Sequence, residues 1–186
     1  MVFYEVLFIG RGGQGGKTAA ELVARIALNK GKFVQSFPDY GPERKGAPVR
    51  AFTRISDSEI RGCSSEANPD IIVIIDPTLI SLNGTLFTIT DKQKVLMNTS
   101  ENPEEIRKQH NITGDLHTVD ATTIALETLK SNITNSSMLG ALSKISGLYT
   151  LEEIKEEFRL EFEKKLSQDA LNNNYAAIEK AYGKVR

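Results

Sequence analysis

The residues best suited to chemistry stand in one glycine-rich run near the start of the chain. In order they are Gly10, Arg11, Gly12, Gly13, Gln14, Gly15, Gly16 and Lys17. A glycine turn that leads into a helix exposes backbone N–H groups and the positive end of the helix dipole, and both favour a bound phosphate. The run therefore predicts a phosphate-binding turn, and all of its residues are candidate contacts to a cofactor.

The spacing of the glycines fits a dinucleotide-binding turn only in part. Gly10, Gly12 and Gly15 match the pattern G-x-G-x-x-G between a predicted strand and a predicted helix. Such a site also needs an acidic residue about 20 positions further on, to bind the ribose hydroxyls. This chain has Gln35 and Ser36 there, so the sequence disfavours NAD.

Two other interpretations of the same run remain. The P-loop pattern would end in Gly16-Lys17-Thr18, but its leading glycine would fall on Arg11, so an ATPase is also disfavoured. Alternatively, the glycines have no ligand and only allow the helix to pack closely on the sheet.

The elements around the turn indicate the fold. Tyr4–Ile9 is apolar and β-prone, which predicts a buried strand, and Thr18–Leu28 has apolar residues at helical spacing. Ile71–Ile75 is a continuous β-branched run typical of a central parallel strand. The predicted fold is therefore α/β, a doubly wound, mostly parallel sheet with helices on both faces, in a single domain over residues 1–186.

Asp76 follows the apolar run directly. Ligands of open α/β sheets gather outside the carboxyl ends of the strands, where Asp76 would stand beside the Gly10 turn. Its carboxylate can also cap a short helix, Pro77–Leu82, which has proline at its first position. Of the two roles, capping is favoured.

The segment Phe37–Pro48 is rich in proline and glycine and is predicted to be a rigid loop, neither helix nor central strand. Its charged and aromatic side chains favour a contact surface, although a plain surface connection also fits. The strand that follows, Val49–Ile55, alternates in side-chain direction, so Arg50 and Arg54 share a face. They could meet an anion or a partner's carboxylate, or lie in solvent.

The remaining elements are predicted from apolar spacing and capping signals. The sequence predicts further strands at Ile60–Cys63, Thr85–Ile89, Val95–Asn98 and Asp115–Val119, helices at Pro103–His110, Ala121–Lys130, Met138–Ile145, Leu151–Leu166 and Gln168–Gly183, and a polar loop at Asn132–Ser137.

Composition excludes several classes of function. A net charge of -1 over 186 residues gives no footprint for nucleic acid, and no apolar run approaches the length that spans a membrane. Without a basic and apolar leader, a cytoplasmic location is expected. The one cysteine, Cys63, excludes an internal disulfide or an iron–sulfur cluster held by this chain alone. His110 and His117 lack partners for a metal site, and no acid, base or nucleophile stands out, so a subunit of a larger enzyme is expected.

Four segments carry a resemblance to a known family. They are Gly10–Lys17, Phe37–Phe52, Asn68–Asp76 and Asn135–Leu142. Through them the chain resembles the gamma subunit of 2-oxoacid:ferredoxin oxidoreductases, the pyruvate/ketoisovalerate family, from its first strand to its last helix.

The resemblance implies a complex that converts a 2-oxoacid, with pyruvate favoured, and CoA to acyl-CoA (acetyl-CoA) and CO2 while it reduces ferredoxin. Thiamine diphosphate, Mg and the iron–sulfur clusters would lie on partner subunits, named alpha, beta and delta, and this chain alone would bind none of them. Its own role would be assembly and access of CoA, and a homodimer is left open.

The resemblance also implies which residues make contacts. The turn Gly10–Lys17 would face the CoA phosphates or a neighbouring chain. Contacts to partner subunits would come from Tyr40, Gly41, Pro42, Glu43, Arg44 and Arg50. Lys45 departs from the family pattern, in which glycines follow the arginine. The alternative function is a free-standing, Rossmann-like nucleotide- or NAD(P)-binding protein.

Overall fold

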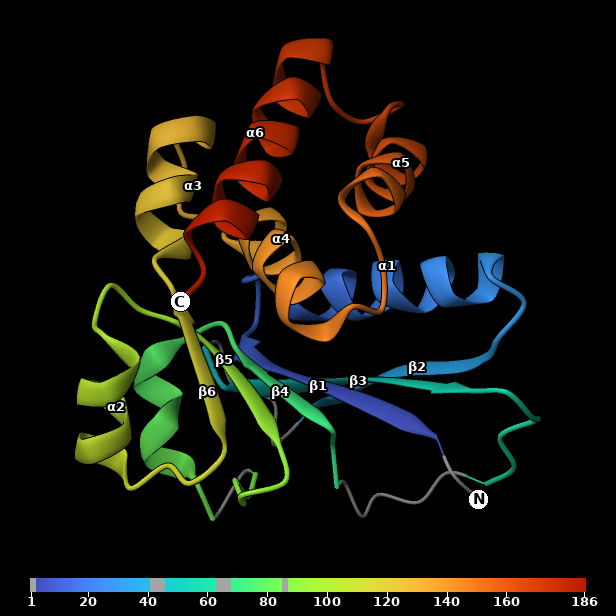
Figure 1. Cartoon of the computed structure of the whole chain (residues 1–186). Helices are drawn as coiled ribbons and strands as arrows, with labels where there is room; N and C mark the ends of the chain where they lie inside the picture. The colour runs from blue at the N-terminus through green and yellow to red at the C-terminus, as the bar shows by residue number, and fades with distance from the viewer. Residues whose placement is uncertain (1–2, 41–45, 63–67, 85–86) are drawn as a thin grey trace.

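The computed structural model describes residues 3–40, 46–62, 68–84 and 87–186, and it shows one six-stranded sheet with the strand order β2-β3-β1-β4-β5-β6 (Figure 1). The strands are β1 (Tyr4–Arg11), β2 (Phe33–Tyr40), β3 (Pro48–Ser56), β4 (Ile71–Ile74), β5 (Lys94–Asn98) and β6 (Asp115–Val119). The helices are α1 (Gly16–Asn29), the 3-10 helix η1 (Pro77–Leu82), α2 (Pro103–His110), α3 (Ala121–Leu129), α4 (Asn135–Ser146), α5 (Leu151–Phe162) and α6 (Gln168–Lys184).

The predicted fold class is confirmed, with a mixed sheet. β1, β4, β5 and β6 run parallel, while β3 lies antiparallel between β1 and β2. Figure 1 shows α1, α3, α4, α5 and α6 on one face and α2 with η1 on the other. The chain leaves β1 toward β2 and leaves β4 toward β5, so the order of the strands reverses between β1 and β4. Such a reversal opens a crevice at the carboxyl ends of the strands.

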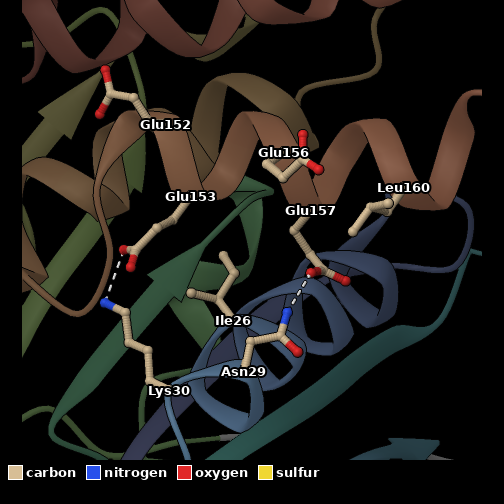
Figure 2. A pocket seen from close by; sticks show the side chains of 8 residues that line it. All are labelled: Ile26, Asn29, Lys30, Glu152, Glu153, Glu156, Glu157 and Leu160. Carbon is tan, nitrogen blue, oxygen red and sulfur yellow. Dashed lines mark hydrogen bonds and ion pairs between the residues drawn. The ribbon is translucent and has the colours of Figure 1, made fainter.

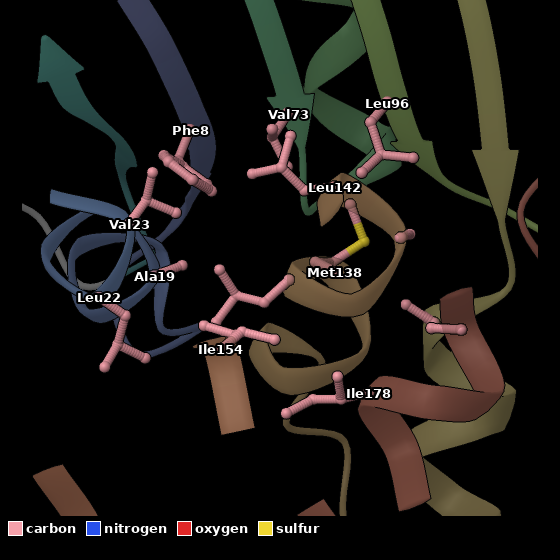
Figure 3. Close-up of a cluster of buried hydrophobic side chains, with 14 of the residues drawn as sticks. Phe8, Ala19, Leu22, Val23, Val73, Leu96, Met138, Leu142, Ile154 and Ile178 are labelled. Carbon is pink, nitrogen blue, oxygen red and sulfur yellow. The ribbon is translucent and has the colours of Figure 1, made fainter. Parts of the chain in front are cut away.

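The larger core lies between the sheet and the layer of five helices. Figure 3 shows Phe8, Val73 and Leu96 from the sheet facing Met138 and Leu142 of α4. These side chains are at most 1% exposed. α4 packs on β4, β5 and β6. Its first residue, Asn135, packs against Gly15, which places the N-terminal end of α4 at the crevice.

The structure differs from the predicted loop at Pro38. β2 continues through Pro38 to Tyr40, so the first part of Phe37–Pro48 is strand. Proline is tolerated there because β2 is the edge strand and needs donors on one side only. Residues 41–45, the rest of the predicted contact loop, lie outside the described residues.

Two further predicted strands are wrong within the described residues. Ile60–Gly62 are irregular, and Cys63 lies outside the described residues. In the segment Thr85–Ile89, residues 85 and 86 lie outside the described residues, and Phe87 forms only an isolated bridge to Asn83. Ile60–Gly62 lies beside the edge strand β2, but there the side chain of Gln35 donates to the carbonyl oxygens of Ile60 and Gly62, at 3.3 and 3.4 Å, in place of a backbone ladder.

The predicted polar loop Asn132–Ser137 is also partly wrong, because α4 begins at Asn135. Asn132 is exposed, but the polar side chains from Thr134 to Ser137 are buried. Ser136 Oγ donates to Asn174 Oδ1 of α6 at 2.5 Å, and Ser136 N donates to Asn135 Oδ1 at 2.9 Å. Partners from a distant helix thus make a polar turn suitable for the interior.

Arg54 and Glu5 form a buried ion pair between β3 and β1. Their side chains are 1% and 2% exposed, and Arg54 Nε lies 2.5 Å from Glu5 Oε2. The guanidinium also lies over the rings of Phe3 and Phe37, at 4.9 and 5.0 Å from their centroids. Of the roles left open for Arg54, the structure shows a carboxylate contact within the same chain.

Helices α4 and α6 cross at Gly140, which gives the first prediction. A Cβ atom at Gly140 would lie 2.0 Å from the carbonyl oxygen of Ile178. We expect Gly140→Ala to push the helices apart and to cost about 1–3 kcal/mol of unfolding free energy, measured by urea denaturation. Gly183→Ala in α6 is the matched control, since a Cβ there meets no atom within 4 Å. Equal stability of the two variants would contradict the close crossing.

Candidate functional site

A cleft of about 300 Å³ lies at the carboxyl end of β1, beside the crevice between β1 and β4. It is lined by Gly10, Arg11, Gly12, Gly13, Gly15, Gly16, Lys17, Thr18 and Val49. Seven of these belong to the predicted phosphate-binding run, of which only Gln14 is missing from the lining. The structure therefore places the predicted cofactor residues together around one cavity.

The turn is closed by hydrogen bonds of its own residues. Gln14 N donates to the Arg11 carbonyl at 3.1 Å, and Arg11 N donates to Gln14 Oε1 at 2.6 Å. Gly15 then begins the helix with φ of 82°, in the left-handed region that favours glycine. A side chain at this position would also collide, because its Cβ would lie 2.9 Å from Asn135 Cβ. The packing role weighed for the glycines therefore holds at Gly15.

The first turn of α1 is open to an anion. Its N-cap residue makes no side-chain cap, and the turn contains no acidic residue. Lys17 is half-exposed, with Nζ 3.6 Å from Glu21 Oε1, and it lines the cleft. Unpaired N–H groups, the helix dipole and one ammonium group on the same cleft suit a phosphate.

Arg11 binds protein groups on the far side of the turn. Its Nε lies 3.0 Å from Asp76 Oδ2, one terminal nitrogen donates to the Gly46 carbonyl at 2.8 Å, and the other donates to Thr78 Oγ1 at 3.0 Å. A guanidinium suits such a multiple contact because it has five donors in a fixed geometry. Arg11 thus connects the turn to the carboxyl end of β4 and to the segment that enters β3.

Asp76 fills both roles considered for it. Its Oδ1 accepts from Thr78 N at 3.0 Å and caps η1, while Oδ2 accepts from Gln14 Nε2 at 3.0 Å. Burial alone would raise the pKa of the Asp76 carboxyl group. The hydrogen bonds from Thr78 and Gln14 and the charge of Arg11 outweigh burial, so the pKa is lowered from 3.8.

The N-terminal end of α4 completes the site, and sequence reasoning missed its place there. Asn135 packs against Gly15, and the two residues lie in different segments that carry the family resemblance. The other two segments contribute Asp76 and, through Gly46 and Val49, the entrance to β3. All four segments therefore meet at the glycine turn, and two of them, Gly10–Lys17 and Phe37–Phe52, line the cleft. The signal available in the sequence was that all four segments carry the family resemblance, but no rule of residue spacing predicts that α4 reaches the turn.

The predicted partner contacts are only partly described. Tyr40 ends β2. Gly41, Pro42, Glu43 and Arg44 lie outside the described residues, as does Lys45. Arg50 pairs with Asp39 across β2 and β3, and its guanidinium lies 5.7 Å from the Phe52 ring centroid.

A second groove, of about 380 Å³, lies between α1 and α5 and is strongly acidic (Figure 2). It is lined by Ile26, Asn29, Lys30, Glu152, Glu153, Glu156, Glu157 and Leu160. Lys30 pairs with Glu153 at 2.8 Å, and Asn29 donates to Glu157 at 3.1 Å. Burial raises the pKa of Glu157 despite the charge of Arg25. Four carboxyl groups around one cavity would repel a phosphate, which disfavours this groove as an anion site.

The part of the chain that the structure describes contains no cluster of His, Cys, Asp and Glu side chains arranged to hold a metal ion. His117 is a strand residue, as predicted, with Nε2 3.2 Å from Asp115 Oδ2. Among the described helices, none has the length and apolar character needed to cross a bilayer.

Fold and site together define a doubly wound α/β domain with a glycine turn at the carboxyl end of β1, beside its topological switch point. A family model described as pyruvate ferredoxin/flavodoxin oxidoreductase matches residues 5–184. The pyruvate synthase subunit PorC of Thermotoga maritima is 41% identical over 184 residues, 99% of this chain and 95% of that protein. The chain belongs to the pyruvate ferredoxin/flavodoxin oxidoreductase family, so the predicted family is confirmed.

Other relatives agree along the whole length. The common gamma subunit of the pyruvate/ketoisovalerate oxidoreductases of Thermococcus kodakarensis is 42% identical and covers 97% of this chain and 96% of its own. The crystal structure of the Thermotoga maritima pyruvate oxidoreductase subunit PORC has a TM-score of 0.86 at 38% identity, covering 100% of this chain and 98% of that one. The 2-oxoglutarate:ferredoxin oxidoreductase of Magnetococcus marinus shares the fold at 20% identity, with a TM-score of 0.80, over 31% of its longer chain.

The lowered pKa of Asp76 gives a prediction for stability against pH. A carboxyl group with a lower pKa in the folded state stabilises the fold above its unfolded pKa and loses that effect as pH falls through the folded value. We expect wild type to exceed Asp76→Asn in melting temperature by a constant margin above about pH 5. The margin should shrink as pH falls below 3.8. A margin that does not change between pH 7 and pH 3, measured by circular dichroism, would contradict the assignment.

Proposed function

We propose that this chain is the gamma subunit of a pyruvate-type 2-oxoacid:ferredoxin oxidoreductase, a subunit without redox chemistry of its own. The observation that carries this proposal is the 41–42% identity, over nearly the full length of both chains, to proteins named as such subunits. The whole chain, residues 1–186, then forms one gamma domain. The complex makes acetyl-CoA and CO2 from pyruvate and CoA and passes electrons to ferredoxin.

The side chains support a subunit that serves chemistry done elsewhere. Within the described residues, no set of groups resembles a metal centre, and the polar side chains that line the cleft are those of Arg11, Lys17 and Thr18. Thiamine diphosphate, Mg and the iron–sulfur clusters then belong to the alpha, beta and delta subunits. Partner contacts are assigned to the end of β2 and the segment that follows it, Tyr40–Arg44, together with Arg50.

The glycine turn is the proposed contact for the phosphates of CoA. The Magnetococcus marinus enzyme was crystallised with coenzyme A bound, and its fold includes this domain. In the present chain, the turn offers an uncapped helix N-terminus and Lys17 on one cleft. A diphosphate placed there gains backbone hydrogen bonds and a favourable helix dipole.

The alternative, a free-standing Rossmann-like NAD(P) protein, is not supported. The relatives of this chain carry the names of oxidoreductase subunits, as given above. The topology also argues against it, because a dinucleotide site uses an acid about 20 residues after the turn, at the end of the next strand in the chain, which lies beside β1. Here that next strand, β2, carries Gln35 and Ser36 at these positions and is separated from β1 by the antiparallel β3.

The subunit role is tested by purification of the tagged chain from its native cells. We expect it to bring down a thiamine-dependent chain and a chain rich in iron–sulfur clusters, identified by mass spectrometry. We also expect the purified assembly to reduce ferredoxin with pyruvate and CoA. Recovery of the tagged chain alone, with the oxidoreductase activity left in other fractions, would refute the proposal.

Gly12 tests the phosphate contact separately from folding. A Cβ atom at Gly12 would meet no protein atom within 4 Å. The need for glycine there would thus come from a ligand that approaches the backbone. We expect Gly12→Val to keep the wild-type melting temperature and to raise the KM for CoA on the order of tenfold, about 1.4 kcal/mol. Assembled complex is assayed at saturating pyruvate.

Gly183→Val is the control for this substitution, because Gly183 is open as well but lies in α6, away from the cleft. It should change neither readout. An unchanged KM for CoA in Gly12→Val would remove the turn from the CoA site, while the subunit role would stand on the purification result.

A further inference from the structure

The carboxylate of Asp76 is the common acceptor for three segments of the chain. Its Oδ2 accepts from Gln14 Nε2 and from Arg11 Nε, each at 3.0 Å. Its Oδ1 accepts from the backbone N of Thr78 at 3.0 Å and from Thr78 Oγ1 at 2.6 Å. Capping of η1 needs only the Thr78 bonds, so the contacts to the turn are additional to the structural role of a cap.

We propose that Asp76 is a positioning residue, which holds the glycine turn in its ligand-ready shape, and that Arg11 couples the turn to the entrance of β3. Asp76 and Arg11 have these roles in the free chain, and their effect on CoA binding rests on the proposed function.

Gln14 transmits the position of Asp76 to the backbone of the turn. Both ends of its amide group are used, since Oε1 accepts from Arg11 N at 2.6 Å and Nε2 donates to Asp76. The side chain can keep both bonds only while β1 and β4 hold their relative position. The peptide between Arg11 and Gln14 is thereby fixed against β4, and with it the N–H groups that face the cleft.

Arg11 extends this link to a third segment. One terminal nitrogen donates to the Gly46 carbonyl, two residues before β3 begins at Pro48. Arg11 and Pro48 are also partners in the ladder between β1 and β3, and Val49 lines the cleft. A ligand that shifts the turn must therefore shift the entrance of β3 or break the bond from Arg11 to Gly46. Arg11 thus couples the cleft to Gly46 and to the entrance of β3.

The first test uses hydrogen–deuterium exchange of the full chain without ligand. We expect Asp76→Ala to exchange roughly three- to tenfold faster in peptides that cover residues 10–16 and 46–50, as loss of about one hydrogen bond at each would give. Asp120→Ala is the matched control, because Asp120 also follows a parallel strand and caps a helix, with Oδ1 2.9 Å from Thr123 N. It should change exchange in α3 only.

Gln14→Met and Arg11→Met separate the two links, and they also serve if Asp76→Ala does not fold. Gln14→Met should speed exchange at 10–16 and leave 46–50 near the wild-type rate. Arg11→Met should speed exchange at both, whereas Lys17→Met, on the same cleft, should leave 46–50 unchanged. Wild-type exchange at 46–50 in Arg11→Met would overturn the coupling, and wild-type exchange at 10–16 in Asp76→Ala and Gln14→Met would overturn the positioning role.

Kinetics of the assembled complex show whether the device acts on CoA. A positioning role predicts that Asp76→Asn raises the KM for CoA several-fold with kcat and the KM for pyruvate unchanged, a pattern that general loss of stability would not give. If exchange changes while kcat and the KM for CoA do not, Asp76 still positions the turn, but CoA is rejected as the ligand of the turn. A lower kcat with an unchanged KM for CoA, that is, the same fractional loss of rate at every CoA concentration, would reject the positioning role.

Discussion

The structure depends on one close approach, where the turn after β1 meets the first turn of α4. At Gly15 there is room for backbone only, because a Cβ atom would lie 2.9 Å from Asn135. This contact joins the start of the chain to a helix more than a hundred residues later. It sets α1 on the sheet, places two helix N-termini at the same edge and leaves the backbone of the turn accessible on one side. The cleft is the space that this packing leaves open.

Charge then divides the helical face into two kinds of surface. The cleft at the turn carries Lys17 and the uncapped end of α1, while the groove between α1 and α5 carries four glutamates. Both cavities border α1, one near each end of the helix. An anionic ligand therefore meets attraction at one end of α1 and repulsion at the other, and no group with reactive chemistry is needed to direct it.

Local signals were enough for much of the fold. The apolar run at Ile71–Ile74 and the helix Pro103–His110, with its capping box at Asn102, appear where the sequence predicted them. The glycine turn and the capping role of Asp76 were also predicted, since both follow from residue types at fixed spacing. These features depend on neighbours in sequence, which is why a single sequence reveals them.

What the sequence did not reveal depends on partners far along the chain. Nothing local indicates that β3 inserts between β1 and β2, or that the polar residues Asn135–Ser137 are buried. In the strand predicted at Thr85–Ile89, the described residue Phe87 bridges only Asn83 and does not join the sheet. At the site, the sequence did not reveal that Arg11 bonds Asp76, Thr78 and Gly46, because these contacts depend on tertiary distances.

The buried pair of Glu5 and Arg54 has a consequence for strand alignment. The two residues are direct partners in the antiparallel ladder of β1 and β3. A slip of one residue would turn every side chain to the opposite face, and a slip of two would separate two charges that are hidden from water, at a cost of about 3–5 kcal/mol. Only one register escapes both penalties. That same register places Pro48 opposite Arg11, so the buried ion pair near one end of the ladder fixes which residue of β3 lies opposite the glycine turn at the other end.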